Sequence, residues 1–167
     1  LTNSHDGLSS FKFQIGLFRL VCSNGLVVMD TSYGDFKLRH MGYTFSELQT
    51  KINEAVSEFP GLVEKINKLQ NTELTDKQID VFAKKAAAVR FGEHVKVDLN
   101  ALIVAERKAD EGNNLWAVFN RVQEKLISGD VGYMNGTKLR KARAVKNFNQ
   151  DLKINEALWS LAEEFVH

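Results

Sequence analysis

A chain of 167 residues with 44% hydrophobic and 26% charged residues has the composition of one soluble globular domain, which excludes a disordered or fibrous protein. Its 22 Lys and Arg residues against 21 Asp and Glu residues leave a net charge of +1, so no global field attracts nucleic acid or an anionic membrane. The single cysteine, Cys22, excludes an internal disulfide and is typical of a reducing compartment. With no apolar run near the roughly 20 residues of a membrane span, we expect a cytoplasmic protein without a membrane partner.

The first 41 residues have the pattern of an antiparallel β-meander. Four residues alternate on one face of a half-buried strand: Phe11, Phe13, Ile15 and Leu17. Asn24-Gly25 is a strong tight-turn signal, and Tyr33-Gly34-Asp35 offers a second turn before residues 36–40. The chain starts with Leu1 rather than Met, in residues that resemble the end of a strand, so we expect an earlier segment to be missing.

From Gly42 onward the hydrophobic period becomes helical. Thr44 and Glu47 form the pattern of a capping box, and Pro60 interrupts the helix that they begin before its apolar stripe continues to Leu69. Thr75 and Gln78 form a second capping box, which opens a helix that Gly92 closes.

Three more helices are expected in the rest of the chain. Asp98 can cap one that runs towards Asp110, Asn113 or Asn114 starts the next, and the last carries Leu158 and Phe165. We therefore predict a single α+β domain over 1–167: a small N-terminal antiparallel β-meander over 1–41, followed by four or five helices over 42–167. A basic hairpin or loop is expected at about 131–147.

Four strings of residues, in order along the chain, are similar to one known family. They are NSHDG (3–7), GLFRLVCSNGL (16–26), LW followed by FNRVQE (115–124), and NEALW followed by LAE (155–163). On these strings the whole chain resembles the phage/plasmid-like proteins of domain-of-unknown-function family 932. The resemblance implies that about a third of a full-length member is absent at the N-terminus. It also implies a gene of bacterial prophages, plasmids and other mobile elements, and it implies no particular mechanism.

Ser4-His5-Asp6 has the residue types of a catalytic triad, but adjacent residues in extended backbone point to alternate faces and cannot converge. A polar turn that needs Gly7 is the favoured interpretation, with His5 or Asp6 left as candidates for a site built with distant residues. The four histidines lack metal-ligand spacing, so we assign no metal, no cofactor and no catalytic residue. An enzyme is accordingly the less favoured class.

Further polar residues accompany apolar stretches. Arg19 lies among apolar neighbours, which favours a structural ion pair. Asn120 and Gln123 border the apolar face of a predicted helix, where a buried hydrogen-bond network is favoured over ligand contact. The less favoured interpretation is that five of these polar residues contribute to a binding site: His5, Asp6, Arg19, Asn120 and Gln123. Trp116 and Trp159 are expected to anchor the core.

Residues 133–153 carry the most informative charge pattern. They hold six cationic residues against the single acidic residue Asp151: Lys138, Arg140, Lys141, Arg143, Lys146 and Lys153. Asn135-Gly136 favours a hairpin turn, which would project the first cations on an arm, with Tyr133 and Phe148 as stacking groups. Such an arm can contact phosphates with salt-sensitive affinity, and the alternative is a solvated loop whose lysines aid solubility.

Three functions are consistent with these patterns. The favoured one is a nucleic-acid-binding accessory factor of a mobile element, with DNA as partner through Lys138, Arg140, Lys141, Arg143 and Lys146. Its narrower form, single-strand binding or annealing, rests on a fold-level analogy of residues 1–70 with phage annealing proteins. The alternatives are a protein-interaction module acting on host defence or replication proteins, and an enzyme whose site needs the missing N-terminal segment. A protein partner or a homo-oligomer is compatible with each of them.

Overall fold

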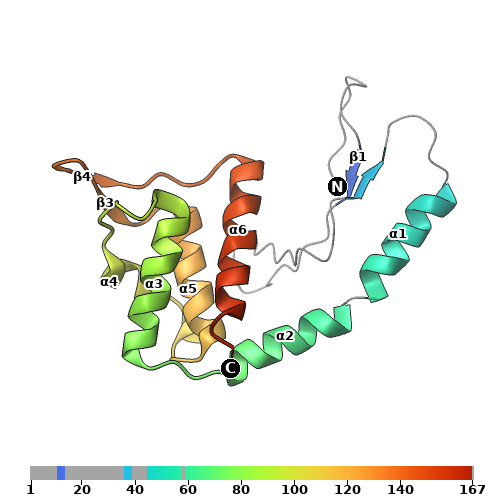
Figure 1. Ribbon diagram of the computed structural model, residues 1–167, viewed down its shortest axis with the longest axis horizontal. Helices are drawn as coiled ribbons and strands as arrows, with labels where there is room; N and C mark the ends of the chain where they lie inside the picture. The colour runs from blue at the N-terminus through green and yellow to red at the C-terminus, as the bar shows by residue number, and fades with distance from the viewer. Residues whose placement is uncertain (1–10, 14–35, 39–44, 58, 167) are drawn as a thin grey trace.

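The computed structural model describes residues 11–13, 36–38, 45–57 and 59–166, which form a mixed α+β protein (Figure 1). In chain order the elements are β1 (Phe11–Phe13), β2 (Phe36–Leu38), α1 (Phe45–Ser57), α2 (Phe59–Asn71), α3 (Asp76–Phe91), α4 (Leu99–Ile103), a 3₁₀ turn (Lys108–Asp110), α5 (Leu115–Ser128), β3 (Gly132–Asn135), β4 (Lys138–Lys141) and α6 (Phe148–Glu163).

The strands form two separate antiparallel pairs. β1 pairs with β2, with Phe11 opposite Leu38, while the rest of the predicted meander and the Asn24-Gly25 turn lie outside the described residues. β3 pairs with β4 between α5 and α6. The α+β class is confirmed, and the second sheet follows most of the helices, at the place where a basic hairpin or loop was expected.

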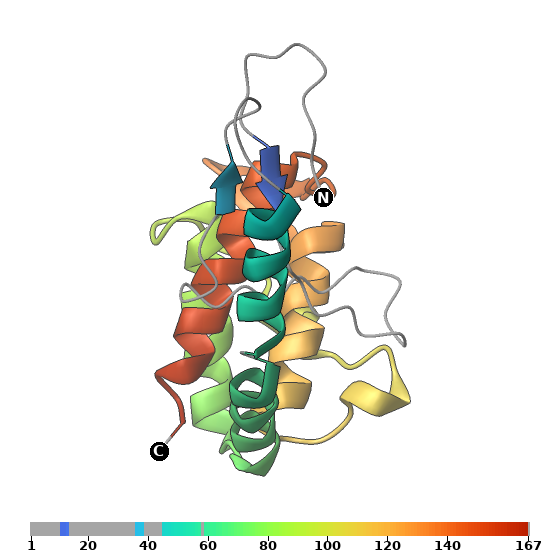
Figure 2. The same ribbon diagram turned by 90° about the vertical axis from the view of Figure 1, so that its right-hand side faces the viewer.

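α3, α5 and α6 run side by side as a bundle, and α2 packs across α5 at one end of it (Figures 1 and 2). The rings of the bundle interlock: Phe119 meets Trp159 edge to face at 5.9 Å, and Phe82 meets Phe165 at 5.4 Å. Leu102 of α4 is fully buried against the same core. Burial of these side chains is the main driving force for the bundle.

Several helix ends follow from local sequence. Thr75 and Gln78 form the predicted capping box, in which the Thr75 amide donates to Gln78 Oε1 at 2.9 Å. Asp98 caps α4, and Asn114 caps α5 by accepting from the Ala117 amide at 2.9 Å. These side chains satisfy amides that have no partner inside the helix. The predicted helix starts at Thr75, Asp98 and Asn114 are confirmed.

The prediction of a helix from Asp98 towards Asp110 is wrong beyond Ile103, where α4 ends. The backbone becomes extended at Val104, with φ −71° and ψ 124°, and the following segment packs against α5. There Glu106 pairs with Lys125 of α5, and Arg107 pairs with Glu124. These contacts with a distant helix override the local helical pattern.

Candidate nucleic-acid interface

The β3–β4 hairpin projects to one side of the helical bundle, near one of its ends (Figure 1). Tyr133 lies opposite Arg140 and Asn135 lies opposite Lys138, so Gly136 and Thr137 form the two-residue turn. Gly136 has a φ of 61°, and among the described residues only glycines have positive φ, which is the pattern of a type II′ turn. The hairpin predicted at this place is present, but its turn lies one residue later than the Asn135-Gly136 signal indicates.

This register distributes the predicted cations between two faces. Residues two apart on a strand share a face, and so do residues opposite one another on paired strands. Lys138 and Arg140 therefore share a face with Tyr133, whereas Lys141 lies on the other face with Leu139. The hairpin does not gather all five predicted cations on one surface.

Lys141 differs from the other cations because it has a carboxylate partner. Its Nζ lies 2.8 Å from Asp130 Oδ1. The hydrogen bond with Asp130 raises the pKa of Lys141, and the same contact lowers the pKa of Asp130. Both groups are solvent-exposed, so the pair is screened, but it leaves Lys141 less available to a phosphate.

Four predicted cations remain exposed and have no ion-pair partner within the part of the chain that the structure describes: Lys138, Arg140, Arg143 and Lys146. All four residues of β4 are exposed, and Leu139 retains 74% of its accessible surface. Phe148, the first residue of α6, is 50% exposed. Tyr133 instead stacks on Phe91, with ring centroids 5.0 Å apart, so one face of its ring is already occupied.

The base of the hairpin is fixed to the bundle by backbone contacts. Ala142 N donates to Val131 O at 2.9 Å, and Val145 N donates to Ile127 O at 2.9 Å. The Arg90 guanidinium, from the last turn of α3, donates to the carbonyl oxygens of Leu126 and Arg143. The chain that carries the cations is thus held at a defined position rather than loosely tethered.

Gly129 makes this close approach sterically feasible. It ends α5 in a left-handed conformation, with φ 88° and ψ 12°. A Cβ at this position would lie 2.6 Å from Ala144 N and would also clash with the backbone of Arg143. Arg90 and Gly129 were not singled out from sequence as parts of the site. Gly129 could have been found from sequence, because a glycine directly after a helix is a C-cap signal. Arg90 could not, because its hydrogen-bond partners lie 36 and 53 residues away in the chain and leave no local pattern.

The polar residues predicted on α5 are turned into the bundle. Gln123 Nε2 donates to Asn155 Oδ1 of α6 at 2.8 Å, and Asn155 Nδ2 donates to the Asp151 side chain at 3.0 Å. Asn120 donates to Trp116 O at 2.6 Å, within its own helix. These amides are buried and hydrogen-bonded, so they do not line the hairpin surface. His5, Asp6 and Arg19 lie outside the described residues.

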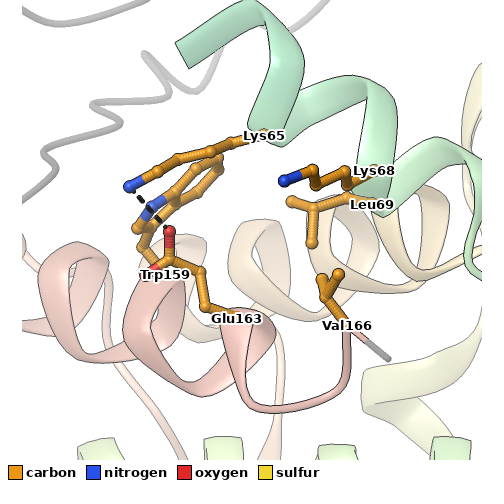
Figure 3. Close-up of a pocket in the computed structure, with 6 residues that line it drawn as sticks. All are labelled: Lys65, Lys68, Leu69, Trp159, Glu163 and Val166. Carbon is orange, nitrogen blue, oxygen red and sulfur yellow. Dashed lines mark ion pairs between the residues drawn. The ribbon is translucent and has the colours of Figure 1, made fainter. Parts of the chain in front are cut away.

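A cavity of about 220 Å³ lies between α2 and α6 (Figure 3). Lys65 of α2 and Glu163 of α6 form an ion pair across it at 3.0 Å. Trp159 lies at its floor but is only 1% exposed, and its buried indole Nε1 has no hydrogen-bond partner among the described residues. Trp116 is partly buried and stacks on Phe119. Trp159 thus belongs mainly to the core, which limits its use as a contact for another protein.

The described residues contain no group of three or more His, Cys, Asp or Glu side chains that could hold a metal ion. Their helices include none that is both long and apolar enough to cross a membrane.

The fold and this surface define a helical α+β protein with an exposed cationic hairpin. Residues 1–159 match the model of the family described as Domain of unknown function (DUF932), and the chain belongs to this family. The family resemblance read from the sequence is therefore confirmed.

Two relatives from Escherichia coli strain K12, UPF0380 protein YafZ and UPF0380 protein YfjQ, are each 38% identical to this chain over 168 residues. Each alignment covers 99% of this chain and 61% of the relative, so the chain spans less than two thirds of their length. No solved structure matches the chain.

Proposed function

We propose that this protein binds nucleic acid through the phosphate backbone, as an accessory factor of a mobile genetic element. The observation that carries the proposal is the projecting β4 strand and the segment after it, which present Lys138, Arg140, Arg143 and Lys146 without ion-pair partners among the described residues. Cationic side chains that are exposed and unpaired can neutralise phosphates and release counterions.

The geometry favours contact with the backbone over reading of base sequence. Lys138 and Arg140 lie on one face of a short strand, and Arg143 and Lys146 follow in a connecting segment. Within the described residues, β4 is only four residues long and places two cations on one face, which is few side chains for reading a run of base edges. We therefore expect affinity that depends strongly on salt and weakly on sequence.

The test is a charge reversal of the unpaired cations, Lys138→Glu/Arg140→Glu/Arg143→Glu, with binding of a fluorescent oligonucleotide measured by anisotropy. The matched control, Lys68→Glu/Lys77→Glu/Lys108→Glu, makes the same change in net charge at exposed lysines of other elements. The hairpin variant should bind about tenfold or more weakly than the control. Equal affinities of the two variants would contradict the proposal.

The protein-interaction alternative has weaker support in this structure. It needs an exposed apolar patch on the helices that carry the tryptophans, whereas Trp159 is almost fully buried. The enzyme alternative stays a prediction, since its candidate residues lie outside the described residues.

A further inference from the structure

A groove of about 950 Å³ lies beside α3, bounded by the exposed side of that helix and the segment 92–99 that follows it. Part of its lining is apolar: Val81 and Ala88 come from α3, and Val95 comes from the following segment. Val81 is 49% exposed. This surface is therefore apolar yet open to solvent.

Cationic side chains border the apolar lining. Lys84 of α3 and Lys96 of the following segment are exposed and have no ion-pair partner among the described residues. Lys85 also lines the groove but pairs with Glu164 at 2.9 Å. Glu93 is the one carboxylate in the lining. The groove therefore combines an apolar floor with a net positive border.

The groove is continuous with the cationic hairpin. Met134 N donates to Lys96 O at 2.8 Å, and Asp98 N donates to Gly132 O at 2.9 Å, so the segment 96–98 runs along β3 as an adjoining strand. Val97, which lines the groove, lies opposite Tyr133, and Tyr133 lies opposite Arg140. Since opposite residues share a face, Arg140 lies on the same side of the sheet as Val97.

We infer that the groove is a binding site for the bases of a single-stranded nucleic acid, a step that rests on the proposed function and specifies its ligand. Bases contact Val81 and Val95, while the backbone phosphates of the same strand contact Lys84 and Lys96 and continue onto Arg140. Single-strand sites in general combine a cationic track with surfaces that accept the flat faces of bases. A duplex keeps its base faces stacked inside, so it can use the cations but not the apolar floor. His94, also exposed in the groove, adds a ring on which a base can stack.

The first experiment separates base contact from charge. Anisotropy titrations compare oligothymidylate, an abasic oligonucleotide of equal length and charge, and a duplex of that length. Intact single strands should bind about tenfold more tightly than abasic strands. The variant Val81→Ser/His94→Ser, which alters two exposed side chains, should remove that difference. Equal binding of intact and abasic strands would overturn the inference.

The second experiment tests the border of the groove. Lys84→Glu/Lys96→Glu should weaken single-strand binding about tenfold relative to the matched control Lys77→Glu/Lys108→Glu. Single-strand affinities equal to those of the control would overturn the inference while leaving the proposed function intact. The proposed function itself fails if reversal of the hairpin cations has no effect on binding. Oligouridylate beside oligothymidylate distinguishes RNA from DNA as the source of the strand.

Discussion

At the scale of single residues, the hairpin depends on one backbone position that only glycine fits. Gly129 has a left-handed φ and lies against the backbone of Arg143 and Ala144. A side chain there would strain the end of α5 and also push away the segment that carries Arg143 and Lys146.

We expect Gly129→Ala to lower the free energy of unfolding by about 2 kcal/mol or more, because left-handed strain and a backbone clash add together. Urea denaturation measures this directly. Gly136→Ala is the matched control: Gly136 also has positive φ, but its added Cβ would have no neighbour within 4 Å. The explanation fails if the two substitutions destabilise the protein equally.

Gln123 and Asn155 form the second residue-scale feature, a buried amide pair that joins α5 to α6. Replacing Gln123 by Met should lower the free energy of unfolding by about 1–3 kcal/mol, because Asn155 Oδ1 would lose its donor while buried. The double variant Gln123→Met/Asn155→Leu should cost less than the sum of the single variants, since neither polar partner then remains unpaired. Additive costs in a double-mutant cycle would show that the pair is not energetically coupled.

At the scale of elements, α6 begins directly after the cationic segment and carries a partly buried carboxyl group in its first turn. Burial raises the pKa of Asp151, while the hydrogen bond from Asn155 acts in the opposite direction. A carboxyl group whose folded-state pKa is raised is easier to protonate in the folded protein than in the unfolded chain. Its contribution to the free energy of unfolding therefore falls as pH rises from the ordinary Asp pKa, about 3.9, through the raised value.

Asp151→Asn removes this titration. We compare the free energy of unfolding of the variant with that of the wild-type protein. The difference, variant minus wild type, should increase as pH rises from about 3.9 to the raised pKa of Asp151, and it should stay constant at higher pH. Thermal unfolding of both proteins over a pH series is the measurement. A difference that is flat, or that decreases with rising pH, would show that burial does not dominate at this carboxyl group.

The elements also show which parts of the structure sequence can predict. Helix starts at Thr75, Asp98 and Asn114 were predictable because each cap bonds an amide three residues away. The end of α4 was not predictable, because the pairing of Arg107 with Glu124 depends on a helix later in the chain. The hairpin was predictable from its glycine and flanking residues, but its turn lies one residue later than expected, so Arg140 rather than Lys138 lies opposite Tyr133.

At the scale of the whole molecule, a net charge of +1 conceals a separation of charge along the chain. The cations of residues 138–146 lie at the end of the bundle from which the hairpin projects, and the groove beside α3 adjoins them (Figure 1). A local cationic surface of this kind can attract a polyanion even when the total charge is close to neutral.

The most direct test is the salt dependence of binding of an oligonucleotide to the wild-type chain. We expect the logarithm of the binding constant to fall linearly with the logarithm of the salt concentration. The four unpaired cations Lys138, Arg140, Arg143 and Lys146, each neutralising one phosphate, contribute about −3 to this slope on a single strand, and Lys84 and Lys96 of the groove add about −1.4. In Lys138→Glu/Arg140→Glu/Arg143→Glu the slope should shrink by about 2, since three of these contacts are lost. A wild-type slope near zero, or the same slope in both proteins, would contradict phosphate binding by the hairpin.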